Sequence, residues 1–203
     1  MRNIVARLWM SEDGIVDRPE YWLPEPALDR LATGAETVLL GRNTFEQYAA
    51  SVARFHGAAV PLDRVRKLVI ASRPVIARPH TEVLQGDPHR VLRALKQVPG
   101  ADLHVVGSVR LVRSLLRWRL IDEVSLLIQP VQAGFGSPLF PDRRALRLIS
   151  MCAGDSGVLE ANYRVDYAAT ATSSRSASAG RWGGTWSTDS VASSASTAIR
   201  THA

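Results

Sequence analysis

The chain has 203 residues, of which 46% are hydrophobic and 22% charged, a composition typical of a globular protein with one substantial core. Its net charge of +6 permits nucleic-acid binding, but the arginines are scattered and no basic run is interleaved with aromatic residues, so that function is the less favoured one. Cys152 is the single cysteine, which excludes an intramolecular disulfide. Since the sequence contains neither a signal peptide nor a run of about 18 apolar residues, we expect a cytoplasmic protein.

The sequence up to about residue 120 alternates strand and helix patterns. Helices are predicted from Pro26 to Thr33, at 88–98 with Asp87 as N-cap and Pro88 in the first position, and at 109–120. Apolar runs typical of strands begin at Asn3, Glu36, Lys67, Thr81, Asp102, Glu123, Ala145 and Glu160. Because the last three strands follow one another without a clear helix, the order predicts an α/β fold, mostly parallel, with an antiparallel C-terminal end.

The composition changes near residue 169. From Thr170 onward the chain is dominated by Ser, Thr, Ala and Gly and shows no sustained apolar period. Such a segment buries too little apolar surface to offset the entropy lost on ordering. We therefore predict one folded domain, residues 1–169, followed by a disordered tail, residues 170–203.

The stretch "LLGRNTFE", residues 39–46, joins a strand to a helix. Asn43 and Glu46 have the spacing of a capping box, which predicts that the helix begins at about Thr44. A helix N-terminus attracts anions, and Arg42 and Thr44 would add a guanidinium group and a hydroxyl group. Alternatively, Gly41 and Arg42 form an ordinary turn with the arginine in solvent.

The same arrangement recurs in "HVVGSVRLVRSLL", where a strand passes through Gly107 and Ser108 into a helix with Arg110 in its first turn. A cation is unfavourable at that end of a helix unless an anion is bound nearby. A third strand end, "VIASRP", brings Ser72 and Arg73 next to each other and could hold the 2′-phosphate of NADP; Arg73 as a plain surface residue fits equally well. Together these turns predict a ligand with several phosphates at the carboxyl edge of the sheet.

The segments "MSEDG", "LLGRNTFE", "VIASRP" and "VVGSVRLVRSLLRWRLIDEVSLLIQPVQAGFGSPLF" together resemble the dihydrofolate reductase-like family, which includes the C-terminal reductase domain of bacterial riboflavin biosynthesis. The resemblance covers residues 1–169. It implies a three-layer fold with a central sheet of about eight strands, helices on both faces, and NADPH as cofactor. Its implied cofactor-binding residues are Gly41, Arg42, Thr44, Ser72, Arg73, Gly107, Ser108, Val109, Arg110 and Leu111.

The sequence departs from the family pattern at the substrate side. Ile15 stands where the riboflavin-pathway reductases typically have a lysine that helps to hold the phosphoribosyl substrate. At the second turn, on the cofactor side, Ser108 replaces the second glycine that dihydrofolate reductases commonly have, so the cis peptide of that family is less expected here. "GFGSPLF" introduces the bulky Phe135 into a glycine-rich loop. Ile15 and Phe135 thus weaken the assignment to the riboflavin pathway and indicate a divergent substrate side.

Two carboxylates are candidates for the acid that hydride transfer requires. Asp13 follows the first strand, and Glu25 resembles the carboxylate that binds the pterin in dihydrofolate reductases, with Asp29 as its alternative. Asp13 could instead be a turn residue before Gly14, and Glu25 could instead stabilise a helix dipole. The histidines lack ligand spacing, so we expect no metal site.

These observations favour an NADPH-dependent reductase of a small heterocyclic, pterin- or pyrimidine-like, or carbonyl substrate. Such an enzyme could resemble 5-amino-6-(5-phosphoribosylamino)uracil reductase. The alternative is a non-catalytic NADP(H)-binding protein with a degenerate substrate site. The family is often dimeric, which makes a homodimer an expectation as well.

Overall fold

The structure is a computed structural model of the whole chain, and it describes residues 1–23, 28–54, 61–76, 78–154 and 157–169. The described strands are β1 Ile4–Ser11, β2 Thr37–Gly41, β3 Arg66–Ile70, β4 Thr81–Leu84, β5 Leu103–Val105, β6 Glu123–Gln129, β7 Ala145–Ala153 and β8 Leu159–Asp166. The described helices are α1 Leu28–Leu31, α2 Arg42–Arg54, α3 Pro88–Gln97 and α4 Val109–Arg117, with short 3-10 helices η1 Pro19–Tyr21 and η2 Pro61–Arg64. The predicted tail, residues 170–203, lies outside the described residues.

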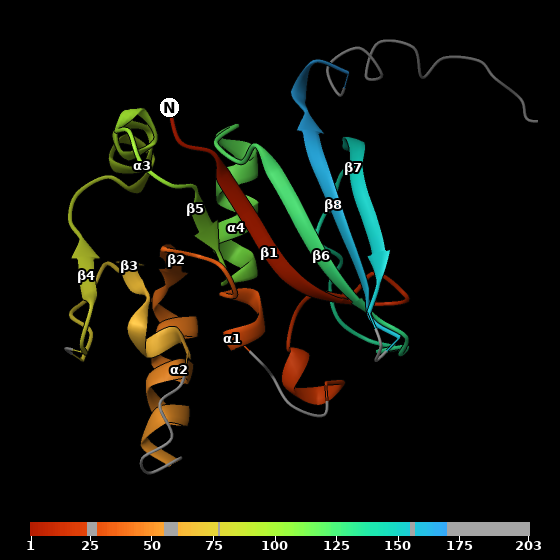
Figure 1. Cartoon of the computed structure of the whole chain (residues 1–203), viewed down its shortest axis with the longest axis horizontal. Helices are drawn as coiled ribbons and strands as arrows, with labels where there is room; N and C mark the ends of the chain where they lie inside the picture. The colour runs from red at the N-terminus through yellow and green to blue at the C-terminus, as the bar shows by residue number, and fades with distance from the viewer. Residues whose placement is uncertain (24–27, 55–60, 77, 155–156, 170–203) are drawn as a thin grey trace, which may run out of the picture.

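All eight described strands form one sheet in the order β4-β3-β2-β5-β1-β6-β8-β7 (Figure 1). The pairs from β4 to β6 are parallel, whereas β8 runs antiparallel to both β6 and β7. The mostly parallel sheet with an antiparallel C-terminal end is therefore confirmed. The sequence did not indicate that β8 would lie between β6 and β7.

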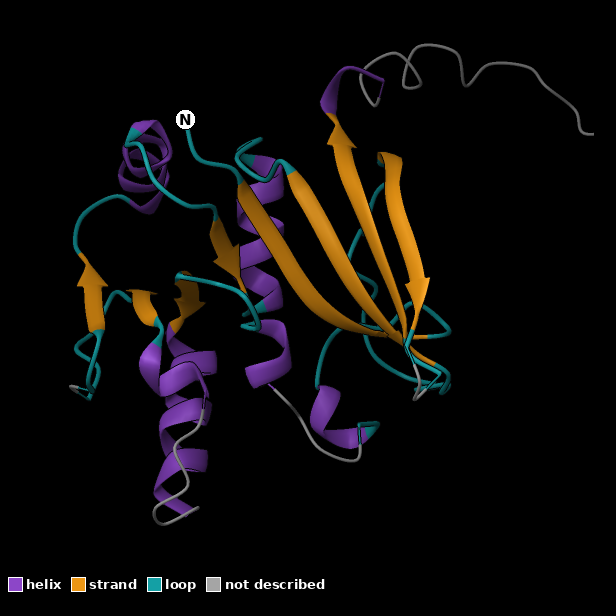
Figure 2. Cartoon of the chain, in the orientation of Figure 1, coloured by secondary structure: helices purple, strands orange, loops and turns teal. Residues whose placement is uncertain are grey.

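Helices cover both faces of the sheet, as expected (Figure 2). One face packs against α3 and α4 in a cluster that includes Leu39, Leu103 and Val105. The other face packs against α1 and α2 in a cluster that includes Phe45 and Tyr48. The central strand β2 is buried on both faces, which explains why its sequence is a continuous apolar run.

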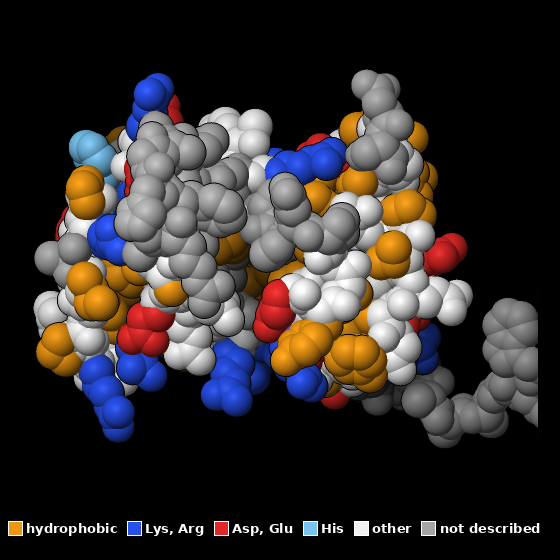
Figure 3. Space-filling model, turned by 90° about the horizontal axis from the view of Figure 1, so that it is seen from below, with side chains coloured by type: hydrophobic (Ala, Val, Ile, Leu, Met, Phe, Trp, Pro, Cys, Tyr) orange, Lys and Arg blue, Asp and Glu red, His pale blue; other side chains and the backbone are white. Residues whose placement is uncertain are grey.

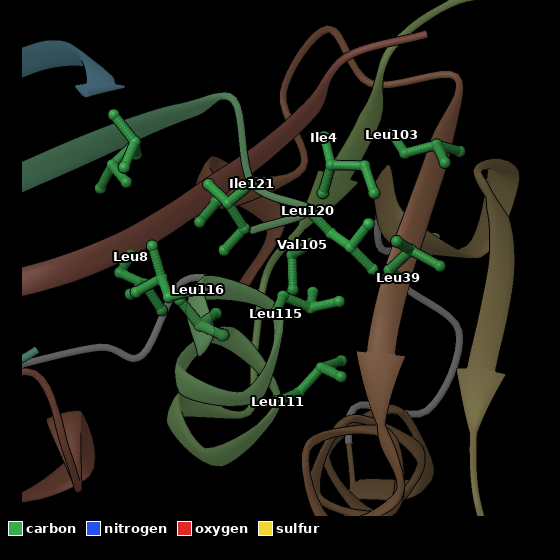
Figure 4. Packing of buried hydrophobic residues seen from close by; sticks show 14 of the residues in the cluster. Ile4, Leu8, Leu39, Leu103, Val105, Leu111, Leu115, Leu116, Leu120 and Ile121 are labelled. Carbon is green, nitrogen blue, oxygen red and sulfur yellow. The ribbon is translucent and has the colours of Figure 1, made fainter. Parts of the chain in front are cut away.

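The amphipathic pattern of α4 determines how this helix sits on the sheet. Leu111, Leu115 and Leu116 all point from the helix toward the strands (Figure 4). Leu115 and Leu116 follow Leu111 by four and five positions, so the three side chains lie on one side of the helix. Burial of these side chains holds α4 against the sheet.

Two of the predicted helix starts agree with the structure. The Asp87 side chain accepts a hydrogen bond from the N–H of Arg90 at 2.8 Å, and Pro88 is the first residue of α3. Ser108 is the N-cap of α4. Among the described residues, no helix has the length and apolar character to span a membrane.

Candidate cofactor site

The turn from β2 into α2 differs in one detail from the prediction. The helix begins at Arg42, immediately after Gly41, and not at about Thr44. Glu46 pairs with Arg42 one turn earlier, with 3.4 Å between Arg42 Nη1 and Glu46 Oε1, and both side chains are exposed. Because α2 starts directly after β2, Asn43 already lies inside the helix and is not its N-cap. Arg42 lies in the first turn.

The turn from β5 into α4 passes through a cis peptide between Gly107 and Ser108. The presence of serine in place of the second glycine has therefore not removed the cis bond of this turn. The Ser108 hydroxyl oxygen accepts the N–H of Leu111 at 3.4 Å, and the Ser108 carbonyl accepts the N–H of Val112 at 3.0 Å. Gly107 has a φ of 136°, a conformation that favours glycine.

The two turns are in direct contact because β2 and β5 are neighbours in the sheet. The N–H of Gly41 donates to the carbonyl of Gly107 at 3.0 Å. A Cβ at Gly41 would lie 2.9 Å from Ser108 Oγ, and a Cβ at Gly107 would lie 2.9 Å from Thr44 Oγ1. Both glycines are thus required for the close approach of the two helix N-termini.

The third predicted element lies on the next strand. Ser72 and Arg73 are exposed just beyond the end of β3, which pairs with β2 on the side opposite β5. The ten residues predicted to bind the cofactor are therefore located at the carboxyl ends of three adjacent parallel strands. The side chain of Leu111, however, is only 8% exposed and belongs to the core.

The electrostatics of this edge favour an anion. The first turns of α2 and α4 contain no acidic residue, and they carry Arg42 and Arg110. Arg73 adds a third guanidinium. In the view from below, Lys and Arg side chains lie mainly along the margins of the molecule, with Asp and Glu side chains between them (Figure 3). The two helix N-termini, with their arginines, therefore lie side by side at an edge whose local charges favour anions.

The carboxylate of Asp13 connects two loops. It accepts hydrogen bonds from the Ser11 hydroxyl at 2.6 Å, from the N–H of Ala133 at 3.0 Å and from the N–H of Gly134 at 2.9 Å. These bonds, led by that of Ser11, lower the pKa of Asp13 to about 2. A carboxylic acid with this pKa stays ionised near neutral pH, so Asp13 suits the anchoring of a loop and is poorly suited to donate a proton.

The similarity of the chain to known proteins agrees with this geometry. The sequence profile described as the RibD C-terminal domain matches residues 3–159. The chain belongs to the RibD C-terminal domain family. A RibD C-terminal domain is a reductase-like domain, so this chain is reductase-like as well.

One curated relative of this RibD-type domain is the uncharacterized protein YyaP of Bacillus subtilis, 23% identical over 177 residues that cover 80% of this chain and 94% of YyaP. Among solved structures, a putative riboflavin biosynthesis protein from Shewanella sp. PV-4 has a TM-score of 0.60 and 15% identity, with coverage of 81% and 99%. Dihydrofolate reductase from Enterococcus faecalis, complexed with NADP(H), has a TM-score of 0.54 and 17% identity, with coverage of 80% and 94%. These two structures confirm the dihydrofolate reductase-like fold.

The second candidate acid of this RibD-type domain, Glu25, lies outside the described residues. Its alternative, Asp29, belongs to α1, which packs on the same face of the sheet as Trp9. Arg30 of the same helix stacks on the Trp9 ring, with 5.5 Å from the guanidinium carbon to the ring centroid. Trp22 is partly buried and packs against the core, and its indole N–H donates to the carbonyl of Asp17 at 3.2 Å.

The connection between loops 12–18 and 131–140 was not predicted. Asp17 Oδ1 accepts the N–H of Ser137 at 2.6 Å, and Ile15 forms an isolated antiparallel bridge with Pro138. A Cβ at Gly136 would lie 2.5 Å from Asp17 Oδ1. The sequence signal was the pair of glycines around Phe135, which allows one loop to approach the other closely.

Proposed function

We propose that the protein is an NADPH-dependent reductase that transfers a hydride to a small heterocyclic or carbonyl substrate. The observation that carries this proposal is the contact between the two strand–turn–helix units, Gly41 against Ser108 and Gly107 against Thr44. This contact joins two anion-binding helix ends into one cradle. Membership of a reductase-like family supports the same function.

The cofactor, when bound, supplies the hydride. In our proposal Arg42, the Thr44 hydroxyl and the first turns of α2 and α4 hold its phosphates. Ser72 and Arg73, one strand away, bind the adenosine 2′-phosphate, and this contact gives NADPH its advantage over NADH. Arginine suits both places because its planar guanidinium can hold a phosphate with two parallel hydrogen bonds.

The substrate in this proposal is a pterin- or pyrimidine-like ring or a small carbonyl compound. A phosphoribosylaminouracil of the riboflavin pathway is one member of that class. Ile15 argues for a different member, because its aliphatic side chain supplies no charge for a substrate phosphate. We assign to Glu25 the donation of the proton that accompanies hydride transfer. Asp13 anchors loop 131–140, since its three hydrogen bonds keep its carboxylate ionised.

A second candidate function is NADP(H) binding without catalysis. The ionised state of Asp13 favours it, because one of the two carboxylates nominated for proton transfer is committed to the loops. Both functions require the same cofactor cradle. They differ in whether a substrate is reduced.

NADPH oxidation, followed by absorbance with a panel of dihydrofolate, pyrimidine and quinone acceptors, separates the two functions. We expect turnover with at least one heterocyclic acceptor, and its loss in Glu25→Gln with NADPH binding retained. Tight NADPH binding without turnover on the whole panel would favour the non-catalytic protein. Failure to bind NADPH would contradict both.

A further inference from the structure

An exposed aromatic cluster connects η1 with loop 131–140. It consists of Arg18, Tyr21 and Phe135, which come from segments far apart in the chain. The rings of Tyr21 and Phe135 meet edge to face, with 6.2 Å between their centroids. The exposed fractions are nevertheless 67% for Tyr21 and 53% for Phe135, so both rings still present apolar surface to solvent.

The guanidinium group of Arg18 lies against both rings. Its central carbon is 5.8 Å from the ring centroid of Tyr21 and 5.9 Å from that of Phe135, distances typical of cation–π contacts. Arg18 forms no ion pair with any residue that the structure describes, and the neighbouring Asp17 instead accepts the N–H of Ser137. Because a cation–π contact uses none of the conventional hydrogen bonds of the guanidinium, the N–H groups of Arg18 can still hold a carboxylate.

The backbone holds this cluster in one arrangement. Arg18 has a φ of 49° and a ψ of 53°, a left-handed conformation that is unfavourable for a residue other than glycine. Such a conformation persists only where the surrounding structure imposes it. Here the bridge between Ile15 and Pro138 and the bond from Ser137 to Asp17 fasten the two loops. The cluster is thus preorganised, which lowers the entropy cost of binding a ligand.

The cluster lies at the same edge of the sheet as the candidate cofactor site. β5 pairs with β1 over Ile4–Ala6, whereas β6 accompanies β1 as far as Ser11. The loops that follow β1 and β6 therefore begin beyond the turn from β5 into α4. Leu23, just after η1, belongs to the same core cluster as Phe45 of α2, so η1 lies on the α2 side of the sheet (Figure 1). A substrate bound by the aromatic cluster would lie beside a cofactor at the turns.

We propose that Arg18, Tyr21 and Phe135 bind the substrate and select a planar heterocycle that carries a carboxylate. The inference rests on the proposed function and names the class of its substrate. The exposed rings stack on the heterocycle, and the guanidinium group pairs with the carboxylate. A single guanidinium matches the one charge of a carboxylate, and Ile15 adds no second charge for a phosphate. The two departures from the family pattern on the substrate side, Ile15 and Phe135, thus have one explanation.

Titration of two pairs of probes with the full-length protein tests the proposal. One pair is pterin-6-carboxylate and pterin, followed by fluorescence anisotropy, and the other is uracil-6-carboxylate and uracil, followed by calorimetry. We expect at least one carboxylate to bind about 10-fold more tightly than its parent ring. Arg18→Met should abolish this preference and leave the affinity for the parent ring nearly unchanged. Phe135→Leu should weaken both members of the pair alike, by about 5-fold, because the flat ring is lost and the charge stays.

Arg93→Met is the matched control, since it removes the same charge from an exposed position of α3, on the other face of the sheet, and it should keep the preference. Circular dichroism should show all three variants folded, because the substituted side chains are exposed. Carboxylates that bind no more tightly than their parent rings would overturn the proposal. So would a preference that Arg18→Met retains, or affinities that Phe135→Leu leaves unchanged. Absence of NADPH binding would contradict the proposed function alone, because the probe titrations do not require the cofactor.

Discussion

The position of Arg42 at the start of α2 calls for an explanation. At the first position of α2 a cation is unfavourable for the helix dipole, and its partner Glu46 is a surface residue one turn away. A surface ion pair of this kind contributes little to stability. The anion that we propose at this turn would account for the placement of Arg42.

Replacement of this side chain tests that account. Arg42→Ala should weaken NADPH binding by about 1.5 to 3 kcal/mol, roughly 10- to 100-fold in the dissociation constant, because a charge-assisted hydrogen bond to phosphate is lost. Fluorescence titration with NADPH measures the change. Arg117→Ala is the control, since Arg117 lies in the last turn of α4, and its affinity should be unchanged. Equal affinity in Arg42→Ala would leave the arginine without a role in binding.

The lowered pKa of Asp13 predicts how the unfolding free energy depends on pH. Its folded-state pKa, about 2, lies below the ordinary 3.8, so the carboxylate stabilises the fold above pH 3.8 and loses that effect as the pH falls toward 2. The difference in unfolding free energy between the unmodified chain and Asp13→Asn should therefore shrink across this window. Asp142→Asn, at an exposed position, provides the control. A difference that stays constant with pH would contradict the anchoring role.

At the scale of elements, the two strand–turn–helix units depend on one another. Each was predictable from its own sequence, because a glycine between an apolar run and an amphipathic segment indicates such a turn. Their contact was not, since it depends on β2 and β5 becoming neighbours although about 60 residues separate them in the chain. The earlier start of α2 was missed for a similar reason. A capping-box spacing records a local preference, and the packing of the two turns overrides it.

Gly41→Ala tests this contact between elements. The added Cβ would meet Ser108 Oγ at 2.9 Å and the Ser108 backbone nitrogen at 3.3 Å, so one turn must move. We expect a loss of about 1 to 3 kcal/mol in unfolding free energy, typical of overpacking, together with weaker NADPH binding. Urea denaturation and cofactor titration measure the two effects.

Gly154→Ala is the matched control, because its Cβ would have no neighbour closer than 3.6 Å. It should change stability by less than about 1 kcal/mol and leave NADPH affinity unaltered. If Gly41→Ala behaves like this control, the two turns do not form a single cradle.

At the scale of the molecule, the alternation of strands and helices was sufficient to predict the α/β class and the antiparallel end, whereas the layers were implied by the family resemblance. The position of β8 between β6 and β7 was not predictable, because any of the three last strands satisfies the same apolar pattern. The long-range hydrogen bonds of Asp13 and Asp17 to loop 131–140 were equally hidden. Turn aspartates look alike in a sequence whether their partners are local or about 120 residues away.

The burial of the two lysines could not be predicted from the sequence either. Lys67 and Lys96 are both buried, at 0% and 6% exposure, although lysine is usually a surface residue. The Lys67 ammonium group donates to the carbonyls of Leu62 at 2.8 Å and Val65 at 2.9 Å, and burial lowers its pKa. Lys96 donates to Asp122 Oδ2 at 2.6 Å. Both ammonium groups are buried because carbonyl and carboxylate oxygens bind them there. The composition of the chain does not reveal these partners.

The central claim is that the three strand ends form one NADPH site, and titration of the purified full-length chain with NADPH and NADH tests it most directly. We predict saturable binding of NADPH in the micromolar range and much weaker binding of NADH, because the proposed site uses Ser72 and Arg73 to hold the 2′-phosphate that NADH lacks. Equal affinity for the two nucleotides would remove these two residues from the site. Absence of binding by either nucleotide would contradict the claim itself.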